Sequence, residues 1–296
     1  MKDQAHGLRE LVQKQSTTHQ EDQKKPEEEL ARIYSVASGK GGVGKTNFTV
    51  NLSLALQAKD RRVGIIDADL GMANIDVVLG LTPQYNLGHV IKGKKKIEEI
   101  IVEGPQNLEV IPGTSGAEEL ANLTDYQLQN LINSWQVLEN KYDIILIDIG
   151  AGISKSVIDF ALAADEIIII STPEPTSVTD AYGLIKTIVN QQQISEINLV
   201  VNRTESDREG KRISNRVTEV VNDFLEIQVN VLGTIPEDKN VIKAVKRQHP
   251  FWLEFPNSKA ANAIKEIRNQ LLDIKEENTS TGVKGFFSKL FGLTDK

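Results

Sequence analysis

The stretch SGKGGVGKT at residues 38–46 constrains the fold more than any other part of the sequence. From Gly39 to Thr46 it fits the pattern G-x-x-x-x-G-K-[ST], after an apolar run and before a helical stretch. This pattern in this setting predicts a loop whose backbone amides converge on phosphate oxygens at a helix N-terminus. Lys45 is then expected to neutralise the β- and γ-phosphates, and the Thr46 hydroxyl to bind Mg²⁺. A glycine-rich turn that binds nothing is the alternative, and the flanking elements disfavour it.

The same loop holds a second lysine, Lys40, which ordinary phosphate binding does not require. Taken alone, Lys40 would be interpreted as a solvated loop residue, so its meaning depends on the other motifs of the chain. The loop residues predicted to bind nucleotide are Gly39, Lys40, Gly41, Gly42, Val43, Gly44, Lys45 and Thr46.

Apolar runs rich in β-branched residues recur along the body of the chain. They are continuous rather than alternating, which is typical of strands covered on both faces. Helical stretches separate them, so the order predicts an α/β fold with a mostly parallel, doubly wound sheet flanked by helices. The predicted strands are 33–38, 63–69, 108–113, 143–148, 166–171, 197–202 and 229–235. The predicted helices are 46–58, 124–139, 154–164, 177–192, 211–225 and 257–275.

Composition excludes several kinds of site. The chain has no cysteine, which rules out disulfides, thiolate metal ligands, iron–sulfur clusters and cysteine nucleophiles. Its formal net charge of −7 argues against a broad basic field for nucleic acid or anionic lipid. The N-terminus lacks the apolar core of a secretory signal, and no apolar run is long enough to span a membrane. We therefore expect a cytosolic protein with at most peripheral membrane contact.

The sequence divides into four segments. Residues 1–14 have apolar side chains at helical spacing, and residues 15–29 contain no hydrophobic residue, as in a flexible linker. Residues 30–275 form the predicted nucleotide-binding domain. Residues 276–296 combine a polar linker with an apolar-rich tail.

Three aspartates follow or end predicted strands. Asp67 and Asp69 stand two apart, so they share a face of an ideal strand or diverge at its end. Asp148 ends the run 143–148 and is expected to contact Mg²⁺. Asn202, Arg203 and Pro236 follow two later strands.

Together these motifs resemble the deviant Walker-A ATPases of the MinD/ParA class, a group of P-loop NTPases, over roughly residues 31–250. The loop of that class reads K-G-G-x-G-K-[ST], matched by Lys40 to Thr46. The resemblance implies that ATP with Mg²⁺ closes a homodimer in which Lys40 reaches the partner's phosphates. Slow hydrolysis to ADP and phosphate then reopens it.

The resemblance also implies roles for the other site residues. Asp67 is expected beside the Mg²⁺ shell, together with Thr46 and Asp148, and Asp69 is expected to orient the attacking water. The catalytic residues would thus be Lys40, Lys45 and Asp69. The base of the nucleotide would lie against Asn202, Arg203 and Pro236. The class usually continues D-x-P-A-G after its metal-binding aspartate, and here glycine, Gly150, replaces the proline.

The tail VKGFFSKLFGL at 283–293 predicts an amphipathic helix. One interpretation is a helix that lies in an anionic membrane surface through Phe286, Phe287, Leu290 and Phe291. The alternative is a helix packed on the core.

The first residues resemble the D-Q-A-x-x-L-R segment of the flagellar-placement branch of the class, called FlhG, FleN or YlxH. This resemblance implies that the segment activates the signal-recognition-particle-type GTPase FlhF, and that flagellar C-ring components are further partners. The residues concerned are Asp3, Gln4, Ala5, Leu8 and Arg9. A tail with an incidental pattern is the alternative. For the whole chain, division-site placement of the MinD type and DNA segregation of the ParA type remain open, although DNA binding is disfavoured.

Overall fold

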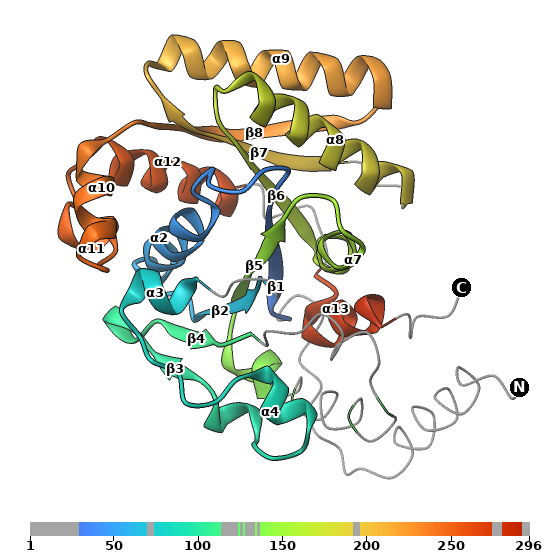
Figure 1. Cartoon of the computed structure of the whole chain (residues 1–296), viewed down its shortest axis with the longest axis vertical. Coiled ribbons are helices and arrows are strands. Elements are labelled where there is room, and N and C mark those ends of the chain that lie inside the picture. Colours follow the sequence, from blue (N-terminus) through green and yellow to red (C-terminus); the bar gives the residue numbers. More distant parts are fainter. Residues whose placement is uncertain are drawn as a thin grey trace, which may run out of the picture.

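A computed structural model describes residues 30–69, 74–113, 124, 127, 134, 137–191, 196–273 and 280–291. The predicted partner-activating segment 1–14 and the linker 15–29 lie outside the described residues. The chain builds one eight-stranded sheet in the order β3-β4-β2-β5-β1-β6-β7-β8 (Figure 1). The strands are β1 (Arg32–Ser38), β2 (Val63–Ala68), β3 (Val102–Glu103), β4 (Glu109–Ile111), β5 (Ile144–Ala151), β6 (Glu166–Ser171), β7 (Glu196–Thr204) and β8 (Gln228–Pro236).

The sheet is parallel except at one edge. Neighbouring strands pair in parallel throughout, apart from β3, which runs antiparallel to β4 with Val102 opposite Val110. The predicted doubly wound parallel sheet is confirmed. The short strand β3 was not predicted, because two residues at a sheet edge leave no detectable apolar run.

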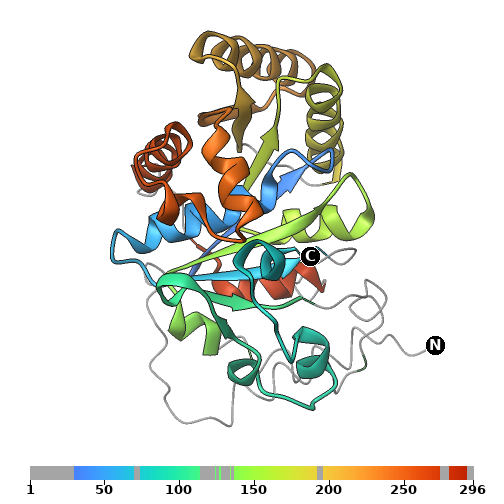
Figure 2. The same cartoon turned by 60° about the vertical axis from the view of Figure 1, so that its left-hand side comes forward.

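Helices cover both faces of the sheet (Figures 1 and 2). On one face α2 and α12 pack together with the shorter helices α10 and α11, and on the other lie α7, α8, α9 and α13. The helices are α2 (Lys45–Gln57), α3 (Ile75–Leu79), α4 (Leu87–Ile91), α7 (Lys155–Ala163), α8 (Pro175–Gln191), α9 (Asp207–Leu225), α10 (Lys239–Lys246), α11 (Phe251–Glu254), α12 (Lys259–Asp273) and α13 (Gly282–Leu290).

The two layers follow from the alternation of side chains along each strand. In β5, Ile145 and Ile147 point into the layer of α7 and α13, whereas Ile144 and Leu146 point into the layer of α2. Asp148 continues the second set and therefore faces α2. The hydrophobic pattern thus decides which way the acidic residue points.

Strand order places one particular edge of the sheet at the centre of the fold. From β1 the chain proceeds to β2 on one side, and it returns later to β6 on the other side of β1. The carboxyl ends of parallel strands at such a reversal form the usual ligand crevice of open α/β sheets. The loop 39–44 joins β1 to α2 at this point.

The C-terminal helix α13 packs against the body of the protein in this structure. Val283, Phe286 and Phe287 are buried, and Leu290 and Phe291 are partly buried against the same core. Phe286 lies 6.2 Å from Phe160 of α7 between ring centroids. Of the two interpretations of the tail, the structure adopts the one in which the helix packs on the core.

Most predicted boundaries agree with the structure to within a few residues. Strand β5 is an exception, because it continues to Ala151 instead of ending at Asp148. Glycine at position 150 keeps the backbone N–H that proline would lack, and Ala151 pairs with Ser38. The predicted helix 124–139 lies mostly outside the described residues, and its described positions 127, 134 and 137–139 are helical.

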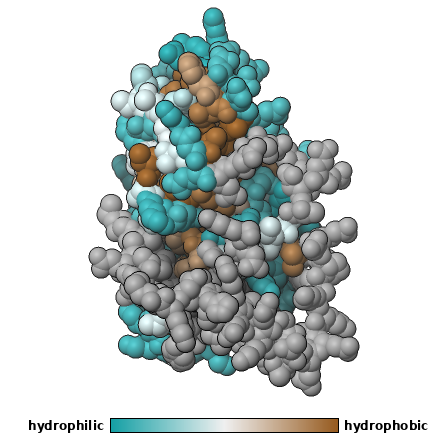
Figure 3. Space-filling model, turned by 90° about the vertical axis from the view of Figure 1, so that its right-hand side faces the viewer, coloured by the Kyte–Doolittle hydropathy of each residue, from teal (hydrophilic) through white to brown (hydrophobic). Residues whose placement is uncertain are grey.

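The outer surface mixes polar and apolar residues. Among the described residues visible from the right-hand side of Figure 1, hydrophilic residues surround a group of apolar residues in the upper half of the face (Figure 3). Among the described residues, no helix combines the length and the apolarity that crossing a membrane requires.

Candidate nucleotide-binding site

The loop after β1 has a shape that only glycine permits at several positions. Gly42 and Gly44 have φ angles of 80° and 96°, in the left-handed region that L-residues with side chains avoid. A Cβ at Gly39 would lie 2.2 Å from the carbonyl oxygen of Asp180, and one at Gly44 would lie 2.4 Å from Nδ2 of Asn202. These close approaches fix the loop against α8 and β7, and the glycines leave its amides unobstructed.

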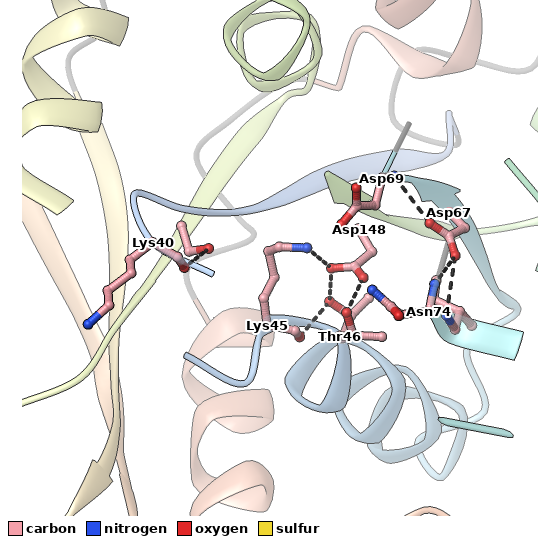
Figure 4. Close-up of polar contacts among 10 residues, drawn as sticks. Lys40, Lys45, Thr46, Asp67, Asp69, Asn74 and Asp148 are labelled. Carbon is pink, nitrogen blue, oxygen red and sulfur yellow. Dashed lines mark hydrogen bonds and ion pairs between the residues drawn. The ribbon is translucent and has the colours of Figure 1, made fainter. Parts of the chain in front are cut away.

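Lys45 and Thr46, the first residues of α2, meet the acid of β5 (Figure 4). Lys45 Nζ donates to Asp148 Oδ1 at 2.8 Å, and Thr46 Oγ1 donates to Asp148 Oδ2 at 2.6 Å. Thr49, one turn further along α2, donates to Asp148 Oδ1 at 3.3 Å. The Asp148 side chain is 1% exposed, so the lysine is the countercharge that allows a carboxylate there.

Asp67 lies on the neighbouring strand, level with Asp148 in the sheet register. Its carboxylate accepts hydrogen bonds from three backbone N–H groups, those of Asp69, Asn74 and Ile75, at 3.1 to 3.2 Å. Burial and, next, the charge of Asp148 raise the pKa of Asp67 to about 6 despite these donors. Two acids this close favour a bound cation.

Asp69 diverges from Asp67, as the end of a strand allows. Strand β2 stops at Ala68, and Asp69 lines a cavity of about 210 Å³ on the opposite side, together with Gly150 of β5 and Ser154 and Phe160 of the α7 segment. Its Oδ1 lies 3.5 Å from the position that a Cβ on Gly150 would occupy. A water held by Asp69 would therefore sit beside the last residues of β5, which follow Asp148.

Lys40 points away from Lys45 (Figure 4). Its Nζ donates to Glu174 Oε2 at 2.7 Å and to Thr176 Oγ1 at 3.1 Å, at the start of α8. The Lys40 hydrogen bond, with its charge, holds the pKa of Glu174 below its ordinary value. The two lysines of one loop thus have separate partners.

The predicted base-lining residues end the last two strands. Asn202 Nδ2 donates to the carbonyl oxygen of Val43 at 2.8 Å, which ties β7 directly to the phosphate loop. Arg203 is exposed with a positive φ of 60°, and its backbone N–H donates to Asn202 Oδ1 at 2.9 Å. Pro236 ends β8 opposite Thr204. The strands bring these residues to the same end of the sheet as the loop.

The contacts of Lys40 with Glu174 and Thr176, and that of Thr49 with Asp148, were not predicted from the sequence. Nothing in the local pattern showed that Glu174 and Thr176 would hold Lys40, because 134 residues separate Lys40 from Glu174. Thr49 could have been found, since position i+4 from Lys45 lies on the same face of a helix.

The residues present fit a Mg²⁺–nucleotide. The Thr46 hydroxyl and the Asp148 and Asp67 carboxylates are oxygen ligands, which Mg²⁺ prefers, and it commonly completes its shell with water and phosphate. Among the residues the structure describes, no cluster of three or more His, Cys, Asp or Glu side chains could hold a metal alone. Fold and site together define a P-loop nucleotide-binding protein.

Comparison with known families agrees with this class. The family model for the CobQ/CobB/MinD/ParA nucleotide binding domain matches residues 34–251. The chain belongs to this family.

Curated relatives cover most of the chain. The antiactivator FleN of Pseudomonas aeruginosa is 38% identical over 81% of this chain and 86% of its own length. The flagellum site-determining protein YlxH of Helicobacter pylori is 34% identical over 88% and 89%. The septum site-determining protein MinD of Bacillus subtilis is 30% identical over 85% and 96%.

Solved structures show the same fold. The septum site-determining protein MinD of Pyrococcus horikoshii, in complex with Mg-ADP, matches with a TM-score of 0.67 at 28% identity, over 83% of this chain and 98% of that chain. A chain of the MinC:MinD cell division protein complex of Aquifex aeolicus matches with a TM-score of 0.64 at 28% identity, over 82% of this chain and 96% of that chain. The predicted P-loop fold of the MinD/ParA class is confirmed.

Proposed function

We propose that this protein is an ATP-dependent dimerising ATPase that regulates the number and placement of flagella. The observation that carries the proposal is the separation of the two loop lysines. Lys45 is committed to Asp148 within its own chain, whereas Lys40 is turned outward and held by a surface carboxylate, Glu174. A lysine placed in this way can reach a nucleotide on a second copy.

In the proposed mechanism, the loop amides and the N-terminus of α2 bind the phosphates of ATP. Lys45 moves from Asp148 to the β- and γ-phosphates, and Asp148 and Thr46 are left to hold the ion. Mg²⁺, when bound, supplies charge neutralisation at the phosphates. Asn202, Arg203 and Pro236 are proposed to line the base.

Closure of the dimer places Lys40 on the partner's phosphates. Asp69, which we place next to the γ-phosphate, orients the attacking water. Because phosphoryl transfer depends on positioning and charge, a cation added from the partner can control its rate. ATP hydrolysis then reopens the dimer, so that the nucleotide acts as a timer.

The flagellar assignment rests on the relatives. FleN and YlxH are named for antiactivation and for flagellum site determination, and they are 38% and 34% identical to this chain. We propose that residues 1–14 activate an FlhF-type GTPase through Gln4 and its neighbours, with residues 15–29 as linker and 30–275 as the ATPase domain. Contact with flagellar C-ring components belongs to the same proposal.

Membrane association is proposed to depend on the C-terminal segment 276–296. Phe286 and Phe287, now in the core, would enter the interface of an anionic membrane once α13 leaves the body of the protein. ATP would promote this step, since a dimer carries two such helices. Peripheral attachment would end with hydrolysis.

Substitution of each lysine tests the proposal. Lys45→Ala should abolish binding of a fluorescent ATP analogue. Lys40→Ala should retain nucleotide binding, lose ATP-dependent self-association in light scattering, and lower turnover by roughly a hundredfold or more, as for other cations supplied in trans. If Lys40→Ala dimerises and hydrolyses ATP as the unmodified chain does, the proposed switch is wrong.

A further inference from the structure

The start of the ATPase domain and the C-terminal segment meet at a pair of carboxylates far from the nucleotide site. Residues 31–33, at the start of β1, lie beside residues 280–283, at the start of α13. In Figure 1, α13 lies at the foot of β1. Glu139, in the helical turn at 137–141, and Asp165, just before β6, each contact both segments.

The two carboxylate oxygens of Glu139 bind one segment each, the start of β1 and the start of α13. Its Oε1 accepts the backbone N–H of Ala31, and its Oε2 accepts the backbone N–H of Val283, both at 2.5 Å. Gly282 has a positive φ of 68°, and a Cβ there would lie 2.6 Å from Glu139 Oε2. The approach of the tail to Glu139 therefore requires glycine at this position.

Asp165 divides its oxygens in a similar way. Its Oδ2 accepts the backbone N–H of Ile33 at 2.9 Å, and the Ser280 hydroxyl lies at the same distance from that oxygen. Its Oδ1 accepts the N–H and the hydroxyl of Thr281 at 2.9 and 2.6 Å. The Ser280 hydroxyl also lies 2.8 Å from the carbonyl oxygen of Ala31, so the two segments contact each other directly as well.

We propose that Glu139 and Asp165 form a clamp that couples release of the C-terminal helix α13 to loosening of residues 31–33 at the start of β1. While α13 is docked, the donors of the tail hold both carboxylates in the position that also satisfies Ala31 and Ile33. When α13 leaves, each carboxylate loses its tail donors and becomes hydrated, and Ala31 loses its contact with Ser280. Water then competes for the N–H groups of residues 31 and 33.

The coupling is reciprocal, because a contact shared by two segments stabilises both. A change that draws Ala31 away from the clamp therefore weakens docking of α13. The inference rests on the proposed function only for its consequence: in a chain held on a membrane through α13, the start of β1 would be held less firmly than in a chain with a docked tail. The clamp itself requires neither membrane binding nor a partner protein.

Hydrogen exchange on the full-length protein tests the coupling without any partner or membrane. In Phe286→Glu, the buried charge should expel α13, so that peptides covering 280–291 exchange fast. We expect peptides covering 30–33 to exchange at least about fivefold faster than in the unmodified protein, while β5 stays protected. A chain that ends at residue 279 lacks the tail by construction and should behave in the same way.

Conservative variants of the clamp provide a second arm. Glu139→Gln keeps the shape of the side chain but has one acceptor oxygen for two N–H donors, so exchange should rise at both 30–33 and 280–291. Asp159→Asn on the outer side of α7, where Asp159 pairs with Lys155, is the matched control and should change neither. Unchanged exchange at 30–33 in the chain that ends at 279 overturns the clamp. Because exchange needs neither flagellar partners nor vesicles, that result would leave the proposed function untouched.

Discussion

At the scale of single residues, the two buried carboxylates of the site have different partners. Asp148 is neutralised by Lys45, whereas Asp67 has three N–H donors but no cation in contact among the described residues. Burial and, next, the charge of Asp148 raise the pKa of Asp67. The sequence predicted that both aspartates belong to the site. It could not predict that their hydrogen-bond donors differ, because the donors come from segments that only the fold brings together.

The pKa of Asp67 predicts a pH dependence of stability. Between its ordinary value of 3.8 and about 6, the folded chain holds a proton that the unfolded chain has lost. The free energy of unfolding should therefore fall, by at most about 3 kcal/mol from this group, as the pH rises through that window. Asp67→Ala removes the group, so the stability cost of the substitution should shrink between pH 4 and pH 7. Urea unfolding of the nucleotide-free proteins measures it, and parallel pH profiles would contradict the assignment.

Glu174 is expected to hold Lys40 back from the dimer. Removing its charge in Glu174→Gln should free Lys40 and lower the ATP concentration for half-maximal dimerisation by about two- to fivefold, since exposed ion pairs are weak. Analytical ultracentrifugation across an ATP series measures the shift. Lys155→Gln, which also removes an exposed ion pair, is the control. Weaker dimerisation of Glu174→Gln would show that Glu174 serves the closed state instead.

At the scale of elements, α7 connects the nucleotide site to the tail. It begins within a few residues of Asp148, Phe160 lines the cavity of Asp69, and the same ring packs on Phe286 of α13. A shift of α7 on nucleotide binding would therefore change the contact between Phe160 and Phe286 that holds α13. The sequence predicted α7 and the tail helix separately, but not their contact, because packing between distant segments leaves no local pattern.

Phe160→Ala should loosen α13 without affecting the phosphate loop. Deleting a buried aromatic ring costs about 3–5 kcal/mol, and part of that cost here falls on the contact with Phe286. Sedimentation with anionic vesicles in the absence of nucleotide should rise at least about threefold over the unmodified protein. Lys155→Ala, on the solvent side of α7, should sediment as the unmodified chain does. If Phe160→Ala also remains unbound, α7 is not the connection.

The predictability of the elements follows their burial. The central strand β1 has a continuous apolar run and was predicted almost to the residue, as was α2, whereas β5 continues three residues beyond its predicted end and α9 begins four residues before its predicted start. The five-residue helices α3 and α4 and the edge strand β3 were missed. They are so short that their few buried residues form no periodic apolar pattern in the sequence. The tail was predicted as a helix, and its amphipathic pattern could not distinguish a core from a membrane.

At the scale of the whole molecule, one hydrophobic surface has two possible partners. Phe286 and Phe287 of α13 are buried against the core of the protein. In the proposed mechanism a membrane competes with that core, so a single helix is expected to bind weakly. Two helices linked in an ATP dimer add their contacts without a second loss of translational freedom.

This competition yields the last prediction. With Mg·ATP, the full chain should sediment with anionic vesicles, and without nucleotide it should stay mostly unbound. Asp69→Ala should sediment at least as well with ATP, because the dimer forms and hydrolysis is slow. Phe286→Glu should not bind under any condition, although its tail is released, because the charge is as unfavourable in lipid as in the core. Asp69→Ala tests whether attachment follows the ATP dimer. Phe286→Glu separates release of the helix from its insertion into lipid. Binding of Phe286→Glu equal to that of the unmodified chain would mean that membrane attachment uses another surface.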